Sequence, residues 1–328
     1  MTTYKEIRGS QIEAVSSDPS NPVEGQVWYN TTSNVLKGQA ATTAGAWSSS
    51  PSLNTARDQI AGAGSTTSAL VFGENFGGET ELWNASSWTE VNDLNTSRRA
   101  LSGAGASNTA ALAFSGNLAA PSPNAATNAT ETWNGSNWTS VNNLNQARSF
   151  AVGTGTNTAA LCFGGSTGSG GNPPLSADTE TWNGTNWTEV NNLNTARPAL
   201  GAGGTTTSAL AFGGYIHPAR QDLTELWNGT NWTEVNDLNT ARLGLKGAGA
   251  DNTACVAFGG SEPPATGKTE VWNGTNWTEQ GDMSNGRTYL ASSKGSSTAA
   301  LAMGGGNTTH VEEFTGAGAG QTRTFTDS

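Results

Sequence analysis

Charged side chains are scarce in this sequence, and positive charge is the scarcer sign. Only 12% of the 328 residues are charged, with 15 Lys and Arg against 26 Asp and Glu and a formal net charge of −11. A nucleic-acid-binding surface needs clustered Lys and Arg to displace the counterions of the phosphates. Because the basic residues are spread along the whole chain, we expect no nucleic acid among the partners and no attraction to anionic membranes.

Cysteine and long apolar runs are also in short supply. The two cysteines, Cys162 and Cys255, are too few for a disulfide framework, and each lies in an apolar segment that predicts a buried free thiol. No apolar stretch approaches the roughly 20 residues of a transmembrane helix, so we expect no membrane insertion. The first residues, MTTYKEIRG, lack the apolar region of a secretory signal, so we expect no signal peptide.

Glycine is abundant, with 43 residues, and Asn, Thr and Ser break the apolar segments into short runs. Long helices need one continuous apolar face built from good helix formers, so helical bundles and doubly wound α/β folds are poor candidates. The chain still has 34% hydrophobic residues and 12 Trp, enough for a sizeable core. This composition predicts an all-β protein.

One internal repeat dominates the sequence. It reads A-R, then G-A-G, then A-L-A-F-G-G, then T-E-x-W-N-G-x-N-W-T-E-V-N-D-L-N. The arginines that begin the units are Arg57, Arg98, Arg148, Arg197, Arg242 and Arg287. Their interval of about 40 to 50 residues is that of one blade of a β-propeller.

Each unit is expected to form four strands, named a to d. In the unit that begins at Arg197, strand a covers 197–203, strand b 209–214, strand c 224–227 and strand d 232–235. Between strands c and d, the sequence Asn-Gly-Thr-Asn is typical of a hairpin turn, because Gly and Asn tolerate a positive φ. The many Asn-x-Ser/Thr triplets of these turns are therefore interpreted as turn chemistry rather than as glycan acceptors.

The two ends of the repeat region predict how the ring closes. Trp47 precedes Arg57 by the same ten residues that separate Trp88 from Arg98, so Trp47 belongs to a strand d that has no strand c before it. At the other end, Glu313 and Phe314 occupy a strand c that has no strand d after it. We predict a six-bladed propeller over residues 46–315, in which the N-terminal strand joins the C-terminal blade and protects its edge.

The repeat, with its double glycine after the second strand and its spaced aromatics, resembles the kelch family of β-propellers over about residues 46–315. Its regular, Asn/Thr-rich form is similar to kelch-like structural proteins in the virions of tailed bacteriophages, especially marine ones. The leader at 19–34, which contains G-Q-V-W-Y-N, is similar to short leaders of such virion proteins.

This resemblance implies a function and a location. It implies a non-enzymatic virion protein, made in the host cytoplasm, that acts as a capsid decoration or as a tail-associated or fibre propeller. The implied partners are other virion proteins or copies of the same chain, with attachment to a host-surface glycan or receptor as a further role. The alternative is a carbohydrate- or receptor-binding, lectin-like propeller.

The residues outside the repeat, 1–45 and 316–328, form an N-terminal arm and a C-terminal tail. In the arm, residues 26–30 and 35–37 are expected to form a hairpin. Two roles stay open for it, a strand pair that caps the propeller or an arm that docks on a neighbouring virion protein. The tail is a Gly/Ala spacer with a short strand-like end that could pair with the arm or with a partner subunit.

Candidate binding residues lie in the arm and in the loops between strands b and c. They are Trp28 and Tyr29 in the arm, and Tyr215, His217 and Arg220 in a b–c loop. The b–c loops vary most among the units and share one face of the propeller with the d–a loops. Loops on a rigid scaffold commonly bind ligands, although variation on a tolerant surface explains them equally well.

A second set of residues recurs once in every unit. It consists of the six arginines above and of Glu81, Glu131, Glu180, Glu225, Glu270 and Glu313. Because a catalytic site breaks the symmetry of a repeat, we interpret this set as structural, with a Glu–Arg or Glu–backbone contact that fixes the d–a turn. A ring of arginines that binds an anion in the channel is the alternative, functional interpretation. The Trp pairs likewise predict cross-strand packing, or a platform for sugars where a Trp is exposed.

No pattern in the sequence predicts catalysis. The two histidines, His217 and His310, stand alone in loops, and no cluster of His, Cys, Asp or Glu has the spacing of a metal site. Some kelch-like propellers are copper oxidases, but no matching set of Tyr, His and Cys is found, and the carboxylates of strand c recur too regularly for a hydrolase pair. We expect no catalytic residue, no metal and no cofactor.

Overall fold

The computed structural model describes residues 12–19, 26–41, 44–74, 77–118, 125–168, 173–317 and 320–325. All elements in these ranges are β-strands, and none of the described residues belongs to a helix long and apolar enough to cross a membrane. The chain divides into two compact units, one formed by residues 46–315 and the other by residues 1–45 together with 316–328.

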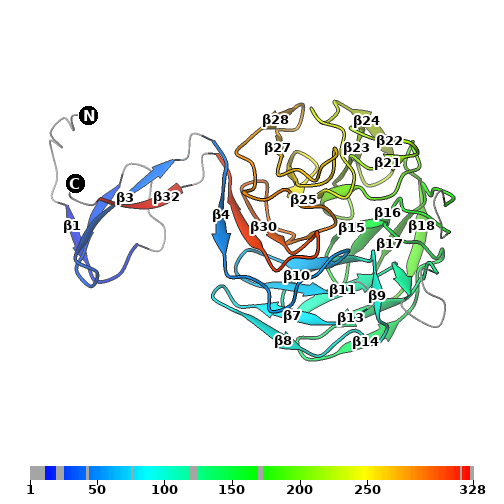
Figure 1. The fold of residues 1–328 in the computed structure, drawn as a ribbon, viewed down its shortest axis with the longest axis horizontal. Coiled ribbons are helices and arrows are strands. Elements are labelled where there is room, and N and C mark those ends of the chain that lie inside the picture. The colour runs from blue at the N-terminus through cyan, green and yellow to red at the C-terminus, as the bar shows by residue number, and fades with distance from the viewer. Residues whose placement is uncertain are drawn as a thin grey trace. The chain divides into compact units, whose positions relative to one another are not determined.

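The larger unit contains six four-stranded antiparallel sheets that follow one another around a central axis as the blades of a propeller (Figure 1). The first three blades are β5 (Ala61–Gly64), β6 (Ala69–Phe72), β7 (Thr80–Trp83) and β8 (Trp88–Val91); β10 (Ser102–Ser107), β11 (Ala110–Phe114), β13 (Thr130–Trp133) and β14 (Trp138–Val141); and β15 (Val152–Gly155), β16 (Ala160–Phe163), β17 (Thr179–Trp182) and β18 (Trp187–Val190).

The last three blades are β19 (Gly201–Gly204), β20 (Ala209–Phe212), β23 (Thr224–Trp227) and β24 (Trp232–Val235); β25 (Lys246–Asp251), β26 (Ala254–Phe258), β27 (Thr269–Trp272) and β28 (Trp277–Glu279); and β29 (Ala291–Ser292), β30 (Ala299–Met303), β31 (Val311–Thr315) and β4 (Ala46–Ser50). There are two short pairs in the loops: β9 (Arg98–Arg99) of a d–a loop pairs with β12 (Asn117–Leu118) of a b–c loop, and β21 (Tyr215–Ile216) pairs with β22 (Ala219–Arg220) within a b–c loop. Residues 119–124 and 169–172 of the long b–c loops lie outside the described ranges.

The sixth blade closes the ring as the sequence predicts. Its outer strand, β4, comes from the N-terminal side of the propeller and pairs antiparallel with β31, with Trp47 opposite Phe314. The aromatic rings of these two residues are 5.1 Å apart between centroids. All six blades are therefore complete, and the edge of β31 is covered.

Local sequence explains the order of strands within a blade. Strand b, the A-L-A-F segment, is buried on both faces, as expected for a central strand. Strand a is rich in glycine because the inner strands of neighbouring blades converge. A Cβ atom on Gly103 would lie 2.5 Å from Cζ of Phe72 in the preceding blade, which leaves no room for a side chain.

Neighbouring blades are joined by the Trp of strand d. Trp138 packs edge-on against Phe72 of the preceding blade, with ring centroids 4.9 Å apart, and its Nε1 donates to Oγ1 of Thr80 at 3.1 Å. Four further seams repeat this arrangement, with the Trp–Thr pairs Trp187–Thr130, Trp232–Thr179, Trp277–Thr224 and Trp47–Thr269. The paired Trp side chains at both ends of each c–d hairpin are buried, at most 6% exposed, so the expected platform for sugars on exposed Trp is wrong.

The smaller unit is a four-stranded sheet made from both chain ends. Its strands are β1 (Glu13–Val15), β2 (Val27–Asn30), β3 (Val35–Ala41) and β32 (Gly320–Phe325), in the order β1-β2-β3-β32. The arm hairpin of the sequence analysis is β2 and β3, and the C-terminal tail adds β32 to it by antiparallel pairing with β3. Arm and tail thus belong to one sheet.

Trp28 is the core of this small sheet. The side chain is fully buried, and its Nε1 donates to Oδ1 of Asp18 at 3.0 Å. Hydrogen bonds from Lys37, Asn30 and Trp28 lower the pKa of Asp18 to about 2. The expectation that Trp28 binds a partner is therefore wrong, because its side chain fills the core of the small sheet and presents no surface to a partner. Its neighbour Tyr29 is 38% exposed and stays a candidate.

Candidate functional site

The repeated Arg and Glu residues form buried ion pairs within the blades. Each arginine lies in a d–a loop and pairs with the glutamate of the strand c that follows, at N···O distances of 2.5 to 3.2 Å, and each side chain is at most 4% exposed. The other carboxylate oxygen accepts a backbone N–H from the same loop, as in Asn239 N to Glu270 Oε2 at 2.7 Å. The pair thus fastens each d–a loop to the next blade. None of the six arginines lines the channel spaces described below, so the expected arginine ring around an anion is wrong.

In the sixth blade the glutamate of this pair is Glu312, and the expectation for Glu313 is wrong. Glu312 Oε1 accepts from Arg287 NH2 at 2.9 Å, and its Oε2 accepts from the backbone N of Ser284. Phe314 takes the place of the Trp in T-E-x-W, and side chains two apart on a strand share a face, which puts Glu312 on the buried face. Glu313 is half-buried on the other face, where burial raises the pKa of its carboxyl group.

The second residue after each arginine builds a closed ring at the entrance of the central channel. These residues are Gln59, Ala100, Phe150, Ala199, Gly244 and Tyr289, and all have φ between 52° and 64°. In this left-handed conformation each backbone N–H donates to the carbonyl of the equivalent residue in the preceding blade. The six bonds are Gln59 N to Tyr289 O (3.1 Å), Ala100 N to Gln59 O (2.8 Å), Phe150 N to Ala100 O (2.9 Å), Ala199 N to Phe150 O (2.9 Å), Gly244 N to Ala199 O (2.9 Å) and Tyr289 N to Gly244 O (2.8 Å).

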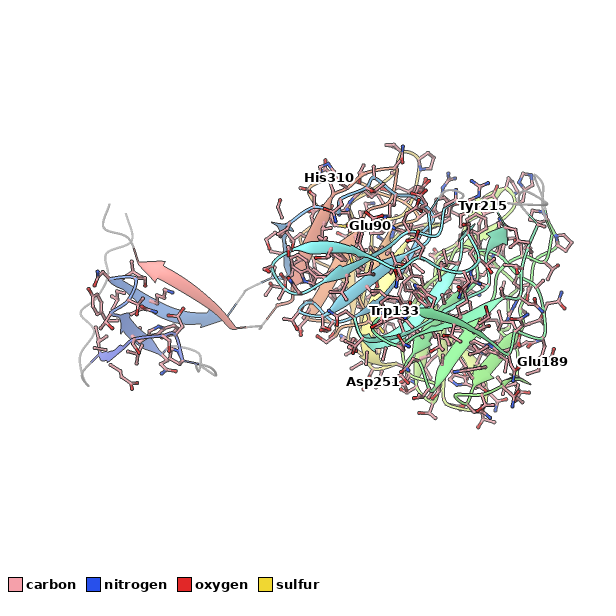
Figure 2. All side chains as sticks on the ribbon, turned by 90° about the horizontal axis from the view of Figure 1, so that it is seen from below. Glu90, Trp133, Glu189, Tyr215, Asp251 and His310 are labelled. Atoms are coloured by element: carbon pink, nitrogen blue, oxygen red, sulfur yellow. The ribbon has the colours of Figure 1, made fainter. Side chains whose placement is uncertain are left out.

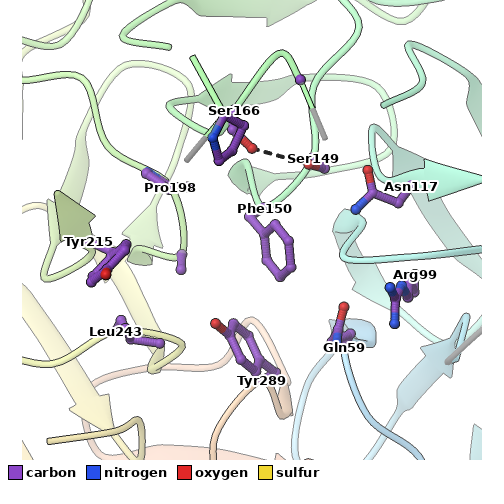
Figure 3. Close-up of a pocket in the computed structure, with 13 residues that line it drawn as sticks. Gln59, Arg99, Asn117, Ser149, Phe150, Ser166, Pro198, Tyr215, Leu243 and Tyr289 are labelled. Carbon is purple, nitrogen blue, oxygen red and sulfur yellow. Dashed lines mark hydrogen bonds between the residues drawn. The ribbon is translucent and has the colours of Figure 1, made fainter. Parts of the chain in front are cut away.

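The side chains of this hydrogen-bonded ring do not follow the sixfold symmetry. Phe150 of the third blade and Tyr289 of the sixth come from opposite sides of the propeller, yet their rings are 5.4 Å apart between centroids (Figure 3). These two residues therefore narrow the channel at its axis. The four other positions carry smaller or more flexible side chains, so the obstruction depends on one aromatic pair.

Above the aromatic pair lies a cavity of about 700 Å³, formed by the b–c and d–a loops. Its lining includes Gln59, Arg99, Asn117, Ser149, Phe150, Ser166, Pro198, Tyr215, Leu243 and Tyr289 (Figure 3). The floor is aromatic, and the walls combine apolar residues with the neutral polar Gln59, Asn117, Ser149 and Ser166 and with Arg99. The Ser149 and Ser166 hydroxyls are hydrogen-bonded to each other at 3.2 Å. A cavity of this size and chemistry suits a small ligand with both apolar faces and hydrogen-bonding groups.

Burial raises the pKa values of two titratable groups near this cavity. Desolvation raises the pKa of Tyr289, and the nearby Asp58 carboxylate raises it further. Burial also raises the pKa of Asp58. The phenol of Tyr289 is consequently a neutral hydrogen-bonding group over the ordinary pH range.

The structure separates the candidate residues of the b–c loop. Tyr215 lines the cavity, whereas His217 and Arg220 do not. His217 Nδ1 lies 3.0 Å from the hydroxyl of Tyr215, and Arg220 is the backbone partner of Tyr215 in the short β21–β22 ribbon. His217 and Arg220 therefore position Tyr215 from outside the cavity.

Most residues that line the cavity were not predicted from the sequence. Gln59, Phe150 and Tyr289 each stand two residues after the repeated arginine, a position that the sequence assigned to strand a. The sequence signal for these residues is the variation at this one position of the repeat. It carries Gln, Ala, Phe, Ala, Gly and Tyr in the six units of an otherwise regular repeat.

The cysteines and the acidic groups offer no further site in the ranges described. Both Cys162 and Cys255 are free and buried as predicted, and burial raises the pKa of Cys162 to about 12. In the part of the chain that the structure describes, no three His, Cys, Asp or Glu side chains gather where they could hold a metal ion.

Comparisons with known proteins identify the fold. No family model matches the chain, and no curated protein matches it. A solved structure titled "Structure of YjhT" is similar with a TM-score of 0.67 and 12% sequence identity, over 81% of this chain and 96% of that one. At this identity the likeness concerns the fold alone. With the six four-stranded sheets and the pairing of β4 with β31, it shows that the chain is an all-β, six-bladed, kelch-like β-propeller closed by its N-terminal strand.

Proposed function

We propose that this chain is a non-enzymatic structural protein of a tailed-phage virion, a capsid decoration or a tail-associated propeller that acts by binding other proteins. The observation that carries the proposal is the division of the chain. Both chain ends leave the propeller from the sixth blade, at residues 45–46 and 315–316, and build a separate small sheet. A sheet made of both ends is suited to attach the propeller to a neighbouring virion protein or to a second copy of the chain.

The outer surface of the propeller fits a protein displayed in many copies. An Asn after strand d donates its side-chain amide to the c–d turn of the next blade, in the ties of Asn92, Asn142, Asn191 and Asn236. Exposed acidic residues such as Glu90 on β8 and Glu189 on β18 lie on outer strands (Figure 2). Neutral amide side chains cover the turns. The net negative charge makes copies of the chain repel one another, which disfavours non-specific aggregation.

A truncation tests the attachment. The propeller alone, residues 46–315, keeps β4 and all six blades, whereas the full chain also carries the small sheet. We expect both proteins to fold and only the full chain to enter purified particles when each is expressed during infection. Incorporation of residues 46–315 at the level of the full chain would contradict the proposal.

A second candidate function, saccharide binding in the manner of a lectin, is favoured by the cavity above Phe150 and Tyr289. Sugar rings stack on aromatic faces and bond to neutral polar side chains, and the cavity offers both. The partner would be a glycan of the host surface, which agrees with a role in attachment.

A glycan array and calorimetry with the full chain test this second candidate. Phe150→Ala and Tyr289→Ala are expected to weaken binding at least tenfold, while Glu189→Ala on the outer strand β18 serves as the matched control. A glycan that binds the control and both cavity variants equally well would place the saccharide site elsewhere and reject this candidate.

A further inference from the structure

Two lysines break the symmetry of the repeat on the wall of the central channel. Lys246 is the fourth residue after Arg242, and Lys294 is the seventh after Arg287. At the first position the other blades have Ala61, Ser102, Val152, Gly201 and Ala291, and at the second they have Gly64, Gly105, Gly155, Gly204 and Gly249. Each lysine thus replaces a small neutral residue, in two neighbouring blades and nowhere else at these positions.

Both lysines line the same small space in the channel. Its other walls are neutral and come from four blades, with Ala61, Gly62, Ser102, Gly103, Val152 and Ser292. The space measures about 10 Å³, close to that of one water-sized sphere. Beneath the aromatic pair a second narrow space, also lined by Lys246, leads toward the entrance.

The positive charges of this space have no acidic partner among the described residues. Lys294 Nζ reaches the opposite blade and donates to the carbonyl oxygen of Gly153 at 2.9 Å. Lys246 Nζ makes no hydrogen bond or ion pair with any described residue, and no Asp or Glu is among the residues that line the space. The strands that form these walls, β5, β10, β15, β25 and β29, contribute no other charged side chain to it.

Two ammonium groups in one narrow space are unfavourable unless something compensates their charge. Burial lowers the pKa of Lys246 to about 8, and burial together with the charge of Lys246 lowers the pKa of Lys294 to about 7. The protein carries a formal net charge of −11, yet none of that negative charge lies in the channel lining at this level. When both lysines are protonated, an anion from solution would supply the compensating charge.

We propose that the channel binds one monovalent anion of halide size, chloride in ordinary solutions, between Nζ of Lys246 and Nζ of Lys294. The ion would accept a hydrogen bond from each ammonium group. It would thus give Nζ of Lys246 the acceptor that the described residues do not provide. A small spherical ion fits this narrow space better than a larger tetrahedral oxyanion such as sulfate. Binding requires both lysines to be protonated, so affinity rises as the pH falls from 9 to 6.

Bromide is the probe that tests the site. Crystals of the full chain grown in sodium bromide are measured at the bromine absorption edge, and one anomalous peak is expected between the two Nζ atoms. Lys246→Ala and Lys294→Gly place at each position a residue that other blades carry there, so both variants are expected to fold and to lack the peak. Lys268→Ala, which removes an ion pair of the surface with Glu262, is the control that keeps it.

Thermal unfolding in solution gives an independent measure. At equal ionic strength, bromide is expected to raise the Tm of the wild type and of Lys268→Ala above the value in gluconate, whose anion is too large for the space. The bromide-dependent rise is expected to be lost in both channel variants. Absence of an anomalous peak in the wild type, or a peak and a Tm rise that persist in both channel variants, would overturn the proposal.

Discussion

Phe314 and Trp47 face each other across the β31–β4 pair, although nearly the whole length of the propeller separates them in sequence. In a complete c–d hairpin the same two positions are occupied by a Trp pair, such as Trp227 and Trp232, joined by a four-residue turn. In the sixth blade no turn joins them. The ring is held shut by strand pairing, by the aromatic contact at 5.1 Å, and by the hydrogen bond from Trp47 Nε1 to Oγ1 of Thr269.

Removal of β4 is therefore expected to abolish folding. A chain of residues 53–315 lacks this strand, exposes the edge of β31 and uncovers Phe314 and Phe258, against which Trp47 packs. We expect aggregation or loss of cooperative unfolding, measured by size-exclusion chromatography and calorimetry. The matched chain of residues 46–315 should behave as a folded monomer. A cooperative transition of residues 53–315 at the same Tm would show that closure does not stabilise the ring.

The glutamates of the sixth blade offer a paired test of register. Glu312→Gln removes the charge that compensates buried Arg287, so we expect a loss of about 3 to 5 kcal/mol in the free energy of unfolding. Glu313→Gln should change it by less than about 0.5 kcal/mol, because burial already favours the neutral form of this carboxyl group. Urea denaturation of the two variants beside the wild type measures both values. Equal effects would contradict the assignment of Glu312 to the ion pair.

The Arg242–Glu270 pair tests what the repeated pairs do for the d–a loops. Arg242→Met should cost about 3 to 5 kcal/mol, because it leaves the Glu270 carboxylate buried without its partner. Glu270 also accepts the backbone N–H of Asn239, so the double variant Arg242→Met/Glu270→Leu should recover little of this loss. Denaturation by urea distinguishes the two cases. Full recovery in the double variant would mean that the pair does not hold the loop.

The strands of the propeller were predictable because the repeat is nearly exact where strands pair. Strands c and d of the fourth blade run over Thr224–Trp227 and Trp232–Val235, as expected from the T-E-x-W and W-T-E-V segments. Strand a was expected from Arg197 but begins at Gly201, since the residues after each arginine form the left-handed ring instead of a strand. Strand b ends at Phe212, because Gly213 has φ of 66°.

The candidate sites were less predictable, because they depend on contacts between blades that are distant in the sequence. Phe150 and Tyr289 meet only because the third and sixth blades face each other across the channel. Lys246 and Lys294 stand at different positions of the repeat, yet both line one space in the folded chain. Alignment of the six units reveals these departures, but not which of them face the channel.

The aromatic pair is expected to control entry to the channel. Phe150→Ala removes one of the two rings that narrow the axis, so the space beneath it should become continuous with the cavity above. The rate of bromide exchange, followed by bromine NMR line broadening, should then rise while the Tm in bromide-free buffer falls by a few degrees. Leu243→Ala, which trims the wall of the same cavity, is the control. Unchanged exchange in Phe150→Ala would mean that the ion enters from the other end.

The channel lysines also predict how stability depends on pH. In the unfolded chain a lysine has a pKa near 10.5, whereas burial lowers the folded values to about 8 for Lys246 and about 7 for Lys294. Between about pH 7 and pH 10 the unfolded state therefore binds more protons than the folded state, so the free energy of unfolding rises with pH. Urea denaturation in gluconate buffer should show this rise in the wild type and a smaller one in Lys294→Gly.

A bound anion should flatten the same curve. It stabilises the protonated lysines of the folded state, which raises their pKa values toward that of the unfolded chain and adds most stability at the low end of the range. Bromide should therefore increase the free energy of unfolding more at pH 7 than at pH 10, and the difference should vanish in Lys294→Gly. The comparison between wild type and variant removes the contribution of other groups that titrate in this range. If the free energy of unfolding depends on pH in the same way with and without bromide, the two lysines bind no ion. Their low pKa values would then follow from burial alone.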